Sequence, residues 1–144
     1  MAEWKRIVAG VDGSDGSRAA LQWAFEEARE HGSELLLISV WTPSPAEIAP
    51  PFGSFPWGTN VDLTEAAEQA LQELLQGVMG EQDDVKVKTQ VVSGNAAKVL
   101  IDSSQDADLL VVGSRGHGGF AGMLLGSVSQ HVAAHASCPV VVVR

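Results

Sequence analysis

Apolar runs of strand length alternate along this chain with segments whose apolar residues recur at helical spacing. Continuous Val, Leu and Ile are typical of strands that are buried on both faces of a parallel sheet. The strands that this pattern predicts are 5–12, 34–41, 85–91, 109–112 and 140–143, and the helices are a segment ending at Gly32 and the segments 63–80, 96–104 and 127–136. The alternation indicates an α/β fold, a single doubly wound domain over 1–144 in which a five-stranded parallel sheet carries helices on both faces.

The third predicted strand differs from the other four. In 85–91, valine or threonine alternates with lysine or glutamine, so one face of the strand is polar. A strand with one solvated face is suited to the border of a sheet, so we expect this strand at an edge.

Composition limits the classes of function. The length of 144 residues and the hydrophobic content of 45% suit a folded domain with its own core. The net charge of −9 argues against a broad surface that binds nucleic acid. No apolar run approaches the ~18 residues of a membrane span, and no signal-type segment follows the basic residues near the N-terminus. With Cys138 as the single cysteine, we expect a cytoplasmic protein whose partners are neither membranes nor nucleic acids.

The last quarter of the chain departs from this acidic average. Residues 109–144 contain no Asp or Glu, but they include two arginines and three of the four histidines. Because the field at a ligand depends on nearby groups, an anion site in this part of an acidic protein is compatible with the overall charge.

An irregular segment follows the second predicted strand. The stretch 43–60 holds five of the six prolines and three aromatic residues. It leaves the sheet at the edge where parallel sheets bind ligands. Three interpretations stay open: a flap over a bound base, a plain surface loop, and a segment that binds another protein.

A glycine-rich loop joins the fourth strand to the last helix. The stretch 113–129 contains six glycines, which suit a backbone that turns at positive φ or approaches a ligand closely. Backbone amides in such a loop, together with the N-terminus of the following helix, form a cradle for anions. Ser127 and Ser129 stand where the helix starts, so their hydroxyls either cap the helix or reach a phosphate oxygen. A long surface loop with capping serines is the alternative.

Two common phosphate motifs do not fit this loop. A P-loop requires Gly-Lys-Ser/Thr, and the loop has no lysine. The stretch 116–121 satisfies G-x-G-x-x-A, but the acid that binds ribose about 20 residues later in dinucleotide-binding folds is missing.

The spacing of the loop glycines resembles a known signature. Gly113, Gly116 and the pair Gly126-Ser127 match the G-2x-G-9x-G-S/T motif of the ATP-binding branch of the universal stress protein family. The opening 7–14, Gly94 and the closing 135–143 are also similar to family segments, so the resemblance covers the chain apart from 43–60. One departure is the Ala96-Ala97 pair, where relatives often carry a proline.

The resemblance implies a strand order 3-2-1-4-5 and an ATP-binding sensor or regulator in the stress response, with magnesium and at most slow hydrolysis. By resemblance, the phosphates would lie among Gly113, Arg115, Gly116, Gly126, Ser127, Val128 and Ser129. Asp12 would meet the ribose hydroxyls and the backbone of Val40 the adenine edge, although Asp12 beside Gly13 also suits a plain turn. The family also implies a homodimer through Val140–Val143.

Other functions compete with this interpretation. One is an enzyme of the same architecture that hydrolyses ATP or transfers adenylyl groups, and another is a nucleotide-free module that binds a partner protein through 43–60.

His131 and His135 have a zinc-compatible spacing but no evident third ligand, so a histidine favoured by the helix C-terminus is the simpler interpretation. Cys138 has no flanking lysine or arginine and is interpreted as a packed structural thiol.

Overall fold

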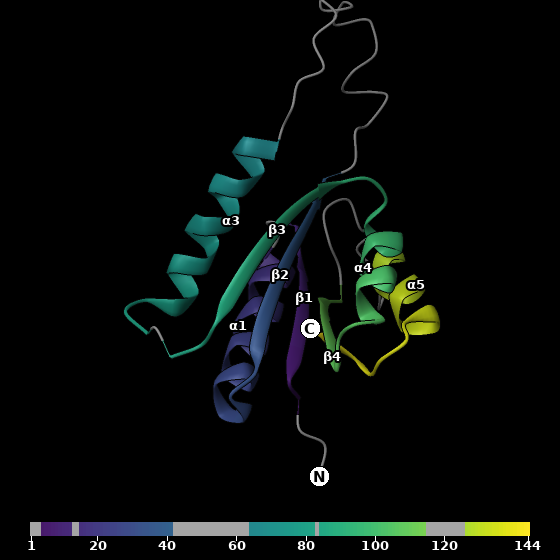
Figure 1. The fold of residues 1–144 in the computed structure, drawn as a ribbon. Coiled ribbons are helices and arrows are strands. Elements are labelled where there is room, and N and C mark those ends of the chain that lie inside the picture. The colour runs from purple at the N-terminus through teal and green to yellow at the C-terminus, as the bar shows by residue number, and fades with distance from the viewer. Residues whose placement is uncertain (1–3, 13–14, 42–63, 83, 115–125) are drawn as a thin grey trace, which may run out of the picture.

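The computed structural model describes residues 4–12, 15–41, 64–82, 84–114 and 126–144 (Figure 1). The strands are β1 (Arg6–Val11), β2 (Glu34–Trp41), β3 (Val87–Ser93), β4 (Leu109–Gly113) and β5 (Val140–Val143). The helices are α1 (Asp15–His31), α3 (Thr64–Met79), α4 (Ala96–Ser104) and α5 (Ser127–His135). Each predicted strand and helix is present, with ends that differ by a few residues at most. The predicted loop 43–60 and the site residues Arg115 and Gly116 lie outside the described residues.

The five strands form one parallel sheet in the order β3-β2-β1-β4-β5. All four neighbouring pairs are parallel, with registers such as Val8 opposite Leu36 and Leu110 opposite Val140. The strand order 3-2-1-4-5 and the position of β3 at an edge are therefore confirmed.

Two helices cover each face of the sheet (Figure 1). Alternate strand residues point to opposite faces, so Ile7, Ala9 and Val11 of β1 pack toward α1 and α3, whereas Val8 packs toward α4 and α5. The first cluster includes Leu21 and Phe25 of α1, and the second includes Leu100 of α4 and Val132 of α5, all of them buried. Burial on both faces explains why the strand sequences are continuously apolar.

The start of β3 falls later than the alternating pattern predicts. The strand begins at Val87 rather than at Val85, although Val85 is buried and belongs to the core beneath α1 and α3. A residue can be buried before its backbone joins the sheet ladder, so the apolar pattern locates the core better than it locates the strand end.

Membrane insertion has no support among the described helices. None of them combines the length and the apolar character that a bilayer crossing requires.

Candidate functional site

The reversal of strand order lies between β1 and β4. From β1 the chain adds β2 and β3 on one side, and it then places β4 and β5 on the other. Since all strands are parallel, their carboxyl ends share one edge of the sheet, and ligands of such folds bind where the order reverses. At this edge Asp12 follows β1, Gly113 ends β4 and Val40 is the penultimate residue of β2.

The strand registers bring these sequence-predicted residues to one edge. Ala9 is opposite Val111, so the ends of β1 and β4 lie at the same level. Asp12 is exposed there. Val40 pairs with Val92 and packs with the apolar cluster beneath α4 and α5, which provides an apolar surface beside the acidic residue.

Ser114 fixes both ends of the glycine-rich loop. Its amide donates to the carbonyl of Val143 at 2.8 Å, which links it to β5. Its carbonyl accepts from the amide of Gly126 at 2.6 Å and from the hydroxyl of Ser129 at 2.9 Å. Ser114 itself is only 8% exposed. These bonds hold the end of β4 against the start of α5.

The first turn of α5 begins beside this edge, next to Ser114. Gly126 is the N-cap residue in an extended conformation, and within the described part of the chain no side chain caps the helix. The first intrahelical bond runs from the amide of Gln130 to the carbonyl of Gly126. The amides of Ser127, Val128 and Ser129 therefore occupy the turn in which a helix offers its N–H groups no carbonyl partner, and where the helix dipole favours an anion.

Helix α4 shows the contrasting arrangement. Its N-cap residue Asn95 accepts a hydrogen bond from the amide of Lys98 at 3.0 Å, so the side chain of Asn95 satisfies one first-turn donor of that helix. The start of α4 is thus capped by the side chain of Asn95, whereas the cap residue of α5, Gly126, has no side chain.

Ser127 and Ser129 have different roles in the structure. Ser127 is exposed at the first position of α5. Ser129 is 3% exposed, and its hydroxyl lies 2.9 Å from the carbonyl of Ser114 and 3.0 Å from that of Gly126. Because a hydroxyl has one proton to donate, the bonds to these two carbonyls occupy the Ser129 hydroxyl as a donor at the base of the loop.

Gly113 is required by packing. A Cβ at this position would lie 2.8 Å from the carbonyl oxygen of Gly16 and 2.9 Å from its carbon. The start of α1 therefore approaches the end of β4 too closely for a side chain. Sequence reasoning attributed this glycine to ligand binding, and it missed Ser114, which no motif distinguishes.

The three residues considered for metal or redox chemistry in this region, His131, His135 and Cys138, have ordinary surroundings. The rings of His131 and His135 are 6.1 Å apart, and both residues are exposed. Burial, together with the nearby carboxylate of Asp108, raises the pKa of the half-buried Cys138 thiol. A raised pKa keeps the sulfur protonated and unreactive, which agrees with a packed structural thiol.

Comparison with known proteins places the chain in a family. The model of the universal stress protein family matches residues 3–144. The chain belongs to this family. A universal stress protein of Mycolicibacterium smegmatis is 41% identical over 138 residues, a match that covers 96% of this chain and 45% of the relative. The chain thus spans about half the length of the curated relatives it matches.

Solved structures of the family have the same fold. Universal stress protein UspA from Lactobacillus plantarum superposes with a TM-score of 0.78 at 23% identity, with each chain covered completely. A universal stress protein in complex with cAMP has a TM-score of 0.71 at 26% identity, with 99% of this chain and 98% of that chain covered.

Proposed function

We propose that this universal stress protein binds ATP, with magnesium, at the carboxyl edge of β1 and β4, and acts as a cytoplasmic sensor or regulator in the stress response. The observation that carries the proposal is the first turn of α5, which has no side-chain cap within the described residues and which Ser114 holds against the end of β4 where the strand order reverses. First-turn amides at such a position are suited to phosphate.

The roles of the residues follow their positions. The phosphates would bind among Gly113, Gly126, the amides of Ser127, Val128 and Ser129, and the loop residues Arg115 and Gly116. The carboxylate of Asp12 would accept hydrogen bonds from the ribose hydroxyls, and the apolar surface at Val40 would contact adenine. Asp12, the acidic side chain among the predicted site residues, would help to hold magnesium, which would supply positive charge to the phosphates.

Two further observations support an adenine nucleotide. A relative of the same fold that is 26% identical is described as a complex with cAMP. The spacing of Gly113, Gly116 and Gly126-Ser127 is the signature of the ATP-binding branch of the family, which favours a triphosphate over a monophosphate.

The groups of the proposed site are suited to holding phosphate oxygens and not to activating water for hydrolysis. Backbone amides and the Ser127 hydroxyl hold phosphate oxygens, but they do not remove a proton from water. We therefore expect at most slow hydrolysis of ATP, so steady turnover well above background would favour an enzyme instead.

A homodimer through β5 (Val140–Val143) belongs to the same proposal. This strand is at an edge of the sheet, and all four of its valines are partly exposed. An apolar edge strand pairs readily with a second copy. Val141→Lys should therefore halve the molar mass that light scattering measures, and an unchanged mass would contradict this interface.

Equilibrium binding tests the proposed function. Calorimetry with ATP, ADP, AMP and cAMP in the presence of magnesium should give the tightest binding for ATP. Asp12→Asn should weaken the binding of all four nucleotides, since each contains ribose, without changing their order of affinity. A folded protein that binds none of the four nucleotides would contradict the proposal and favour a module that binds a partner protein.

A further inference from the structure

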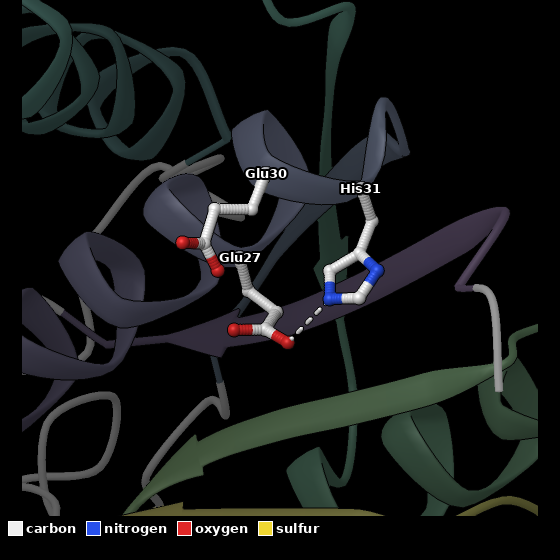
Figure 2. Close-up of side chains that lie close together, drawn as sticks. All are labelled: Glu27, Glu30 and His31. Atoms are coloured by element: carbon white, nitrogen blue, oxygen red, sulfur yellow. Dashed lines mark hydrogen bonds and ion pairs between the residues drawn. The ribbon is translucent and has the colours of Figure 1, made fainter. Parts of the chain in front are cut away.

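Three side chains that can ligate metals converge at the end of α1, on a helix that plays no part in the proposed nucleotide site beyond its first turn. Figure 2 shows Glu27, Glu30 and His31 with their polar atoms turned toward one another. The spacing places Glu30 and His31 three and four residues after Glu27, so the side chains share one face of the helix. One ligand atom from each residue lies within 4.8 Å of the other two.

The geometry of the closest pair suits a metal ion. Nε2 of His31 lies 3.0 Å from Oε1 of Glu27. A zinc ion bonds imidazole nitrogen and carboxylate oxygen at about 2.1 Å, so two neighbouring ligands of one ion are roughly 3.0–3.4 Å apart. In this structure the two atoms form a hydrogen-bonded ion pair, and a metal ion bound here would take the position of the proton between them. Glu30 is exposed, and one of its ligand atoms lies within 4.8 Å of those of the other two residues.

The charges at this place also favour a cation. The nearest basic residue on the helix, Arg29, is on a different face and forms an ion pair with Asp84 at 2.9 Å. Within the described residues Glu30 has no ion pair, so its carboxylate is not neutralised by that part of the chain. His31 is the last residue of α1, and the C-terminal end of a helix attracts positive charge.

The surroundings restrict two of the three side chains. The side chains of His31 and Glu27 are 31% and 23% exposed, respectively. The ring of Trp4 meets the His31 ring edge-on at a centroid distance of 6.5 Å. A ring held in this way loses less freedom when it binds an ion than a free surface histidine would.

We propose that Glu27, Glu30 and His31 form a binding site for a first-row divalent ion of the zinc type, with water completing the coordination. One imidazole and two carboxylates suit zinc better than magnesium or calcium, which prefer oxygen ligands alone. The site is independent of the nucleotide site, since it lies at the opposite end of α1 from Gly16, which contacts Gly113.

Calorimetry with zinc chloride on the nucleotide-free protein tests this proposal. The wild type should bind one zinc ion, Glu30→Gln should weaken binding at least tenfold, and Glu27→Gln/His31→Ala should abolish it. The matched control is His131→Ala/His135→Ala, which removes the other histidine pair at the same spacing and should leave the affinity unchanged. Circular dichroism should show that all variants remain folded, because the substituted side chains are exposed or partly exposed.

A second measurement identifies the ligand directly. Among the four histidines, only the imidazole nitrogens of His31 should shift in a nitrogen-15 spectrum when one equivalent of zinc is added. Retained binding in Glu27→Gln/His31→Ala, loss of binding in the His131/His135 control, or no binding by the wild type would each overturn the proposal.

Discussion

The amide of Gly126 donates to the carbonyl of Ser114 at 2.6 Å, and this bond joins the last helix to the end of β4. Through Ser114, whose amide bonds to Val143, the same contact extends to the edge strand β5. The position of the α5 start is therefore set by the sheet and not only by the loop between them. In the proposed function, a helix start fixed in this way would be organised for the phosphates before the nucleotide binds.

The buried hydroxyl of Ser129 should contribute to stability. Ser129→Ala removes the hydrogen bond to the Ser114 carbonyl, while the Gly126 amide still occupies that acceptor. We expect a loss of about 0.5–1.5 kcal/mol in the free energy of unfolding, measured by urea denaturation. Ser127→Ala at the exposed neighbouring position should change it by less than about 0.5 kcal/mol. Equal effects of the two substitutions would contradict the assigned roles.

A methyl group at Gly113 should disturb the packing of α1 on β4. The new Cβ would meet the backbone of Gly16 at 2.8 Å, and backbone cannot move aside as a flexible side chain can. Gly113→Ala should therefore destabilise the fold by about 1–3 kcal/mol in thermal or chemical unfolding.

Gly77 provides a control of opposite sign. It is exposed within α3, and the nearest atom to a Cβ there is Nη2 of Arg18 at 3.6 Å, an ordinary contact. Gly77→Ala should stabilise the protein by about 0.5–1 kcal/mol, because alanine favours a helix more than glycine does. A neutral Gly113→Ala would show that the close approach of α1 and β4 is relaxed in solution.

The carboxylate of Glu34 should make stability depend on pH. A hydrogen bond from Lys88 is the largest cause that lowers the pKa of Glu34 below its ordinary value of 4.5. Desolvation opposes it as the next largest effect, and the charge of Lys88, the hydrogen bond from Arg6 and the charge of Lys86 lower the pKa further. Because the pKa is lower in the folded state, the stabilisation is present above pH 4.5 and is lost as the pH falls through the folded value.

A comparison of melting temperatures measures this effect. The wild type should melt above Glu34→Gln at pH 7, and the difference should shrink as the pH falls below 4.5 through the folded pKa. Lys88→Met should remove most of the difference at pH 7, since the hydrogen bond from Lys88 is the largest contribution. A difference that is constant from pH 7 to pH 3 would show that Glu34 acts through packing instead of charge.

The fold was predictable because several strands repeat the same pattern of continuous apolar residues. Val8, Leu36 and Leu110 face one layer of helices while Ile7, Leu35 and Leu109 face the other, so continuous apolar runs identify buried parallel strands. The start of β3 was less predictable, because Val85 is buried in the core without belonging to the strand. The family resemblance supplied the strand order, which the pattern alone does not determine.

The candidate site was predictable in part. The glycine spacing located the loop and the α5 start, since amides need glycine nearby to approach a ligand. It did not distinguish the packed Ser129 hydroxyl from the exposed Ser127, because both are serines at a helix start. Ser114 was not predictable, since it contributes backbone groups that any residue has. The cluster of Glu27, Glu30 and His31 depends on side-chain positions, and the sequence shows only a helical spacing that surface residues often have.

The measurement that tests the central claim most directly is ATP binding to Ser127→Glu. A glutamate at the first position of α5 suits the helix dipole and should preserve the fold. Its charge would stand beside the phosphates, where repulsion of about 1–4 kcal/mol weakens the binding of ATP at least about fivefold. Gln76→Glu adds the same charge at an exposed position of α3 and should leave ATP affinity unchanged. Tight ATP binding that survives in Ser127→Glu would show that the phosphates do not bind at the start of α5 and would contradict the account.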